Sequence, residues 1–182
     1  ARGYEFDGTS DQLVLDDFNF GSSNWTVSSW YKPLSSSGYG HILTDKNSQG
    51  NFACKISKDL KPYFYAGSSF RTYSNTPSIP LNEWSFICYI FDGANLLIYI
   101  DGALEESEAT TGNEIPSNQY VVQGGNSEYV NAVHSDLRIY ERVLSPEEVG
   151  ILYKMTNPES TEQVSMSSDA LYTKGQIKEV IA

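Results

Sequence analysis

Short apolar runs separated by small and polar residues follow one another from the N-terminus to about residue 140. Within many runs the apolar residues recur at every second position, as Trp84, Phe86, Cys88 and Ile90 do. This alternation is typical of strands with one face against a core, and Gly, Pro, Asn and Ser between the runs indicate turns. The pattern predicts strands over residues 3–6, 12–15, 25–32, 41–45, 52–57, 62–66, 70–73, 84–91, 96–100, 104–108, 120–124 and 134–140.

Two Asp-Gly pairs give the strongest turn signals. Asp92-Gly93 closes the apolar run that begins at Trp84, and Asp101-Gly102 closes the next one. Gly adopts positive φ without steric cost and Asp tolerates the turn, so this pair is a strong hairpin signal. The segment therefore predicts consecutive antiparallel strands.

One helix start is clear after the last predicted strand. Ser145 stands at the N-cap position, Pro146 at the first helical position and Glu148 at the third. This is a capping box with a proline start, and Leu144 and Val149 are spaced for a hydrophobic staple. We expect a short helix over residues 146–153 to close the domain.

The C-terminal segment has a different composition. Residues 154–169 are rich in Ser, Thr, Glu and Asn and lack a strong apolar period, whereas residues 170–182 regain apolar side chains. Their spacing fits a helix and a docking strand about equally well. We therefore divide the chain into a domain over residues 1–153 and an arm over residues 154–182 for assembly or docking. The arm's expected contact residues are Leu171, Tyr172, Ile177, Val180 and Ile181.

Composition narrows the function. The 182 residues include 40% hydrophobic residues, enough for a core, and carry a formal net charge of −11. An acidic chain is repelled by phosphate backbones and anionic lipids, and no apolar run reaches the roughly 20 residues needed to span a bilayer. We expect neither a nucleic-acid nor a membrane partner. Cys54 and Cys88 lie inside apolar runs, which favours buried free thiols over a disulfide.

The ordered motifs resemble the laminin-G-like, concanavalin A-like family of jelly rolls. The matching pieces are Phe6-Asp7-Gly8 with residues 13–15, the run 25–33, the segment 84–102, Gln123-Gly124-Gly125 and the segment 136–149. The resemblance implies an all-β sandwich of two antiparallel sheets followed by the short helix. One departure lies before the last strand, where the family's Gly-x-Ile-Asp-Asp is replaced by residues 130–136, without the Gly and the first acid.

We expect no catalysis. Some enzymes with this jelly roll use clustered carboxylates on one strand, but here Glu5 and Asp7 are followed by Ser10 rather than by a third acid. The acidic run 105–108 reads as a solvated edge strand, because exposed charges discourage edge pairing. His41 and His134 do not stand near a nucleophile motif.

Calcium is the one candidate cofactor, and the pattern does not require it. By resemblance, relatives bind calcium through the opening Phe-Asp-Gly segment and the acid of the closing strand. Those positions here are Asp7 and Asp136, with Asp11 as a helper. Hard oxygen ligands suit Ca²⁺. The alternative, which we favour, is that Asp7 forms an Asx turn and Asp136 caps a turn.

A sugar-binding surface would use exposed aromatic rings. The densest aromatic stretch is 62–73, and its candidate binding residues are Tyr63, Tyr65, Arg71 and Tyr73. Because one face of a strand in a sandwich packs into the core, we favour a structural role for these rings.

The function that fits these observations is a non-catalytic structural or adhesion protein of a virus particle, such as a capsid decoration or tail-associated component. It resembles jelly rolls with short assembly extensions in bacterial-virus particles. We expect a location on the virion surface, contacts to itself or to other virion proteins through the arm, and a cell-surface glycan as a further partner. The alternative is an exported, extracellular carbohydrate-binding module that uses calcium.

Overall fold

The computed structural model describes residues 3–15, 24–45, 52–66, 76–109, 120–122, 129–159 and 177–179. The strands in these ranges are β1 Tyr4–Asp7, β2 Leu13–Leu15, β3 Trp25–Pro33, β4 Gly40–Asp45, β5 Phe52–Ile56, β6 Pro62–Ala66, β7 Ser85–Phe91, β8 Asn95–Ile100, β9 Ala103–Ala109, β10 Tyr120–Val122, β11 Asn131–Tyr140 and β12 Ile177–Glu179. The helix in these ranges is α1 Pro146–Met155. No helix among them is long and apolar enough to cross a membrane.

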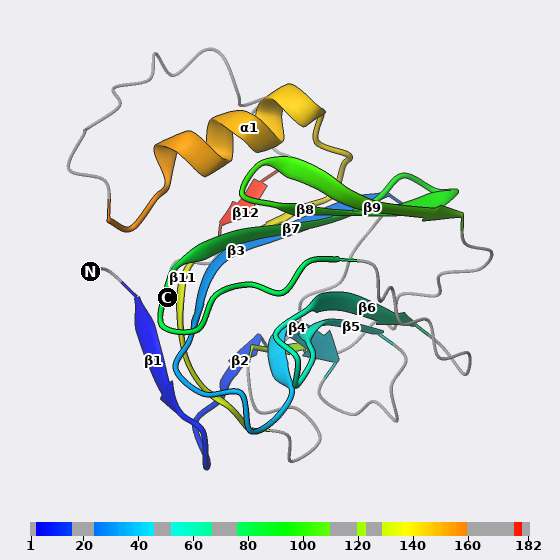
Figure 1. Ribbon diagram of the computed structural model, residues 1–182. Coiled ribbons are helices and arrows are strands. Elements are labelled where there is room, and N and C mark those ends of the chain that lie inside the picture. The colour runs from blue at the N-terminus through cyan, green and yellow to red at the C-terminus, as the bar shows by residue number, and fades with distance from the viewer. Residues whose placement is uncertain are drawn as a thin grey trace.

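The strands form two antiparallel sheets that face each other (Figure 1). The seven-stranded sheet has the order β1-β11-β3-β7-β8-β9, and β12 also pairs with β11. The five-stranded sheet has the order β2-β10-β4-β5-β6. Sequence neighbours such as β3 and β4 lie in different sheets, as a jelly-roll sandwich requires. The predicted all-β sandwich with one short helix is confirmed.

The main core lies between the sheets. Trp25 of β3 is fully buried, and its ring centre lies 5.3 Å from that of Phe52 and 5.5 Å from that of Phe64. The Tyr89 hydroxyl donates a hydrogen bond of 2.8 Å to the backbone carbonyl oxygen of Lys55 in the opposite sheet. Aromatic burial supplies most of the packing area at such positions.

The outer face of the seven-stranded sheet is also buried, because α1 lies over it (Figure 1). Trp30 stacks on Tyr153 with ring centres 5.6 Å apart, and its Nε1 donates to Thr156 Oγ1 at 2.8 Å. Cys88 belongs to this second cluster, whereas Cys54 belongs to the core between the sheets. Both thiols are buried and free, as we predicted.

The capping box that the sequence predicted opens α1. The Ser145 hydroxyl accepts from Glu148 N, and Glu148 Oε2 accepts from Ser145 N at 2.8 Å. The Glu148 carboxylate also accepts hydrogen bonds from both terminal nitrogens of Arg142, at 2.8 and 2.6 Å. The helix continues to Met155, two residues past the prediction, because Thr156 closes it with bonds to the Leu152 carbonyl.

The other strand boundaries shift by a few residues. β11 begins at Asn131 rather than at residue 134, because its first residues pair with β1 on one side and β3 on the other. The acidic run forms β9, the exposed terminal strand of its sheet, and confirms the predicted edge strand. The predicted strand at 70–73 lies outside the described residues.

Candidate functional site

The Asp7 carboxylate is the centre of a tight turn after β1. Its Oδ1 accepts from the backbone nitrogens of Thr9 at 2.7 Å, Ser10 at 2.9 Å and Asp11 at 3.2 Å. Its Oδ2 accepts from the hydroxyls of Thr9 and Ser10. The side-chain bond from Thr9 and the backbone bonds hold the pKa of Asp7 well below its usual range. The carboxylate therefore organises a turn, because its lone pairs already accept five donors.

Asp136 lies elsewhere. β1 is antiparallel to β11, which places Asp7 opposite Asn131 and leaves Asp136 roughly 15 Å further along the strand. Asp136 has a φ of 53° and lies where the β11–β3 register shifts. Its two carboxylate oxygens accept hydrogen bonds from Arg138 Nε at 3.0 and 2.9 Å. Asp7 and Asp11 are brought together, since Asp11 Oδ2 accepts from Asp7 N at 3.0 Å.

The three candidate calcium ligands are therefore not brought together. Calcium takes six to eight oxygens at 2.3–2.6 Å, and Asp7, Asp11 and Asp136 cannot surround one ion. In the described ranges, no group of three or more His, Cys, Asp and Glu side chains is placed to hold a metal. The carboxylates that do meet are occupied by the turn's own N–H and O–H groups. These residues do not fit a calcium centre.

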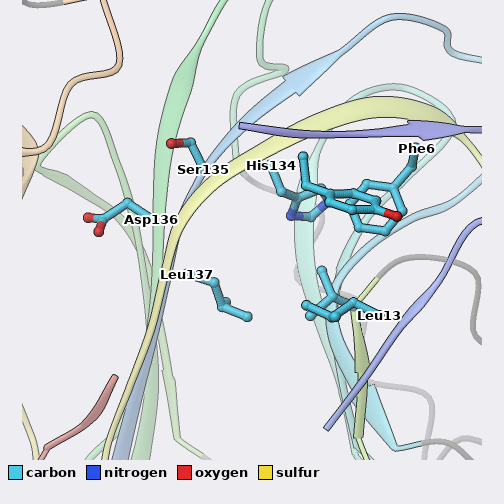
Figure 2. A pocket seen from close by; sticks show the side chains of 8 residues that line it. Phe6, Leu13, His134, Ser135, Asp136 and Leu137 are labelled. Atoms are coloured by element: carbon cyan, nitrogen blue, oxygen red, sulfur yellow. The ribbon is translucent and has the colours of Figure 1, made fainter. Parts of the chain in front are cut away.

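A small hollow lies where β1 and β11 face the edge of the five-stranded sheet (Figure 2). Its volume is about 20 Å³, room for about one water. It is lined by Tyr4, Phe6, Leu13, Val122, His134, Ser135, Asp136 and Leu137. Figure 2 shows His134 and Leu137 on one side of β11, with Ser135 and Asp136 on the other. The bulge puts two consecutive side chains on the same side.

His134 lies at the inner side of this hollow and is 5% exposed. Its ring makes edge contacts with Tyr31 at 4.8 Å and Phe6 at 5.1 Å between ring centres. Neither ring nitrogen has a hydrogen-bond partner within the part of the chain that the structure describes. Burial lowers the pKa of His134 to about 3, and His41 contributes to the lowering. The imidazole is neutral and lacks the oriented carboxylate or hydroxyl that a general base would need.

Among the candidate sugar-binding residues, Tyr63 has the structural role that we favoured. Tyr63 is 6% exposed, so its ring cannot offer a face to a sugar. The ring of Tyr39 lies 6.2 Å from that of Tyr63 at an interplanar angle of 67°. Tyr65 belongs to β6 but its side chain is outside the description, as are Arg71 and Tyr73 altogether.

The edge of β11 carries part of the C-terminal arm. β1 covers the first residues of β11, where Tyr4 pairs with His134, and β12 covers the last ones, where Glu179 pairs with Arg138. β12 thus pairs with its own chain, at Ile177 and the two residues after it. Leu171, Tyr172, Val180 and Ile181 lie outside the described residues. The assembly role of the arm stays a prediction.

Sequence reasoning missed two features of these surfaces. It did not single out Tyr39, whose ring contacts that of Tyr63, or Lys55, which lies opposite Tyr63 in the register of β5 and β6. It also did not predict that β1 and β12 both pair with β11. A pairing register between distant segments was needed for both, and the alternating pattern of one strand does not supply it.

The sandwich and its outer helix define a lectin-like jelly roll. The match to the concanavalin A-like lectin/glucanases superfamily (Laminin_G_3) covers residues 7–150. The chain belongs to this family. A comparison with curated proteins finds no match.

Solved structures show the same fold. The binding domain of botulinum neurotoxin serotype D aligns with a TM-score of 0.62 and 19% identity, over 84% of this chain and 42% of that chain. The binding domain of botulinum neurotoxin DC, solved in complex with rat synaptotagmin II, aligns with a TM-score of 0.67 and 15% identity, over 84% and 42%. The chain thus spans less than half the length of these neighbours, and at these identities the likeness concerns the fold.

Proposed function

We propose that this chain is a non-catalytic adhesion and assembly protein of a virus particle, either a capsid decoration or a tail-associated component. The protein lies on the virion surface, where its sandwich faces a target such as a cell-surface glycan. Its C-terminal arm joins it to other virion proteins or to further copies of itself. The observation that carries the proposal is the edge of β11, which accepts an extended segment of the arm as β12. Strand addition to a sheet edge is a general mode of protein association.

The geometry allows this strand to come from a neighbouring subunit. β12 makes three residue pairs with β11, and residues 160–176 separate it from the turn after α1, which is described up to Glu159. Seventeen residues can span up to about 60 Å when extended, so the arm reaches past its own domain. Exchanging an identical element between copies keeps the same contacts and is a low-cost route to oligomers.

The test is exchange of the arm between copies. Arg138 and Glu179 are direct partners in the register, so we would make Arg138→Cys and Glu179→Cys as separate chains and mix them with a short thiol crosslinker. Cys54 and Cys88 are buried, so they do not compete while the chain is folded. Arm exchange predicts crosslinked heterodimers. A chain that carries both cysteines is the comparison. If crosslinks form only within such single chains, and the full-length chain sediments as a monomer, arm exchange is rejected.

Truncation supplies the matched control. The cut belongs after Glu159, because Thr156 still bonds to Trp30 and caps α1. We expect the shortened chain to fold with the same unfolding midpoint and to lose assembly and particle binding. If the shortened chain still assembles, the arm is not the assembly element.

Two features support the absence of catalysis. Within the described ranges His134 has no carboxylate or hydroxyl partner of the kind a general base uses, and the nearby hollow has room for about one water. The acids of β9 lie on an exposed edge strand rather than in a cleft. Incubation of the purified chain with polysaccharides should release no new reducing ends, and turnover that tracks the protein on purification would overturn the proposal.

The alternative is an exported carbohydrate-binding module. The family to which the chain belongs, the lectin-like sandwich and the binding domains among its structural neighbours favour this reading. A glycan array, run with and without chelator, tests it. We expect any sugar binding to survive the chelator, because Asp7 and Asp11 are committed to their turn. Saturable sugar binding by a chain that never assembles would place this alternative first.

A further inference from the structure

The part of β11 that pairs with β12 is a short acceptor for an extended segment. Its three pairs are Arg138 with Glu179, Ile139 with Lys178 and Tyr140 with Ile177. Backbone N–H and C=O groups are the same in almost every sequence, so a ladder of this length cannot by itself select one segment or one register. The side chains of β11 must supply that selection.

The two faces of this part of β11 differ in chemistry. Ile139 is buried in the core between the sheets, whereas Tyr140 belongs to the cluster beneath α1, on the other face. Arg138 lies two residues before Tyr140 in the same strand and shares that outer face, because side chains alternate along a strand. An added strand therefore meets a guanidinium and an aromatic ring at alternate positions.

The Arg138 side chain is ordered before any charged partner is considered. Both carboxylate oxygens of Asp136 accept from its Nε, at 3.0 and 2.9 Å, and the side chain of Arg138 is 16% exposed. Burial alone would lower the pKa of Arg138, but the hydrogen bond and charge of Asp136, together with Tyr140, raise it above its ordinary value. An ordered guanidinium loses less conformational entropy when it binds.

Arg138 can serve a second carboxylate. Asp136 accepts from Nε, one of the three guanidinium nitrogens, and a guanidinium carries five N–H donors. Arg142 is the neighbouring cation, 5.9 Å from the centre of the Tyr140 ring, but both its terminal nitrogens donate to Glu148. The chain as a whole has a net charge of −11 and repels an acidic segment. An acidic residue in an added strand is therefore favoured opposite Arg138, against the repulsion from the rest of the molecule.

We propose that Arg138 is the specificity-determining residue of a strand-acceptor site on β11. The site takes an extended segment with an acidic residue opposite Arg138 and an apolar residue two positions earlier, opposite Tyr140. Residues 177–179, Ile-Lys-Glu, have this order. The inference rests on the assembly part of the proposed function, and it names the class of segment that a second copy or another virion protein must present.

Hydrogen exchange of the full-length chain measures how tightly residues 177–179 dock. We expect the parent to protect these amides, and Glu179→Gln to raise their exchange rates, corrected for intrinsic rates, about two- to fivefold, the range for a cross-strand charge pair. Glu179→Lys places like charges opposite each other and should raise the rates further. Glu159→Gln removes the same charge from an exposed residue outside the ladder and should change nothing.

Charge reversal tests the pair itself. Arg138→Glu should abolish the protection, and Arg138→Glu combined with Glu179→Arg should restore most of it. If an Arg138 variant fails to fold, the Glu179 variants still decide the question, because they alter only the added strand. Equal rates in the parent, Glu179→Gln and Glu179→Lys, equal rises in Glu179→Gln and Glu159→Gln, or an unprotected parent segment would overturn the site.

The crosslinking test of the arm is independent of this one. Hydrogen exchange measures docking whether the strand comes from the same copy or from a neighbour, whereas the crosslinks report which copy supplies it. Crosslinks only within single chains, together with loosening by Glu179→Lys, would reject arm exchange and keep the site. Crosslinked heterodimers without any effect of charge would do the reverse. An exchanged dimer of the two cysteine chains also keeps one native pairing of Arg138 with Glu179.

Discussion

The hydroxyl of Tyr89 and the backbone carbonyl of Lys55 join the two sheets through a hydrogen bond of 2.8 Å. Tyr89 is fully buried, and burial raises the pKa of its hydroxyl well above the ordinary value, so it stays a donor across the physiological range. The bond ties the middle of the seven-stranded sheet to the strand that carries Lys55. It thereby links the core to the outer face of the five-stranded sheet.

Tyr89→Phe should lower the free energy of unfolding by about 1–2 kcal/mol, because a hydrogen bond is lost in the core. Urea unfolding at neutral pH measures the change. Tyr4→Phe is the control, because Tyr4 is 44% exposed, and it should have little effect. Equal stability of the Tyr89 variant and the parent would mean that water or a neighbour replaces the bond.

Acid should weaken the domain through His134. Its pKa falls to about 3 in the folded chain, below the ordinary 6.5, so the unfolded chain binds the proton more tightly. Stability is therefore full above about pH 6.5 and is lost as the pH falls toward 3. His134→Phe, which keeps a ring between Phe6 and Tyr31, should reduce the loss in urea stability between pH 7 and pH 5.

The pH range separates this effect from that of the carboxylates. The pKa of Asp7 is also lowered, but an Asp contributes to acid loss below its ordinary value near 4. An unchanged difference between pH 7 and pH 5 in His134→Phe would contradict the assignment to His134.

Removal of the capping box should loosen α1. Ser145→Ala removes the acceptor of Glu148 N and should lower the free energy of unfolding by about 1 kcal/mol. Because α1 covers Trp30, the loss should also appear in tryptophan fluorescence. Glu159→Ala, in an exposed residue beyond the helix, is a neutral control. A drop of similar size in both variants would argue against a role for the cap.

Two glycines near α1 should respond in opposite directions to Ala. Gly102 has a φ of 83°, and a Cβ there would lie 3.2 Å from Tyr153 Cδ1, so Gly102→Ala should destabilise the domain by about 1–2 kcal/mol. Gly150 lies inside α1 with open space around it, so Gly150→Ala should stabilise it by about 0.5–1 kcal/mol. Thermal unfolding of both variants checks the two signs, and a shift in the same direction would refute the comparison.

Local chemistry made part of this fold predictable. The Asp101-Gly102 pair adopts φ values of 51° and 83°, as its composition indicated, and Ser145 and Glu148 form the box that their spacing predicted. Such features depend on residues within a few positions of one another. The alternation of Trp84, Phe86, Cys88 and Ile90 was right about a shared face, but it could not tell that this face packs against a helix.

The sites were harder to predict because they depend on pairing between distant segments. Asp7 and Asp136 were candidate ligands of one calcium site, yet the register places Asn131 beside Asp7. Tyr63 was a candidate for a binding surface, yet its ring is buried and lies 6.2 Å from that of Tyr39, more than twenty residues away in the chain. In both cases the residue type was informative about chemistry, and only the register fixed the neighbours.

β1 and β12 run in the same direction along one edge of β11. Tyr4, at the start of β1, therefore lies nearer to Glu179, at the end of β12, than the other ends of the two strands do. Only three residues of β11 separate the partner of Tyr4 from the partner of Glu179. A tether attached before β1 and another attached after β12 would therefore leave from one corner of the sandwich. A circular permutant that joins these two positions by a short glycine-rich bridge and opens the chain elsewhere should keep the native hydrogen-bonded ladder.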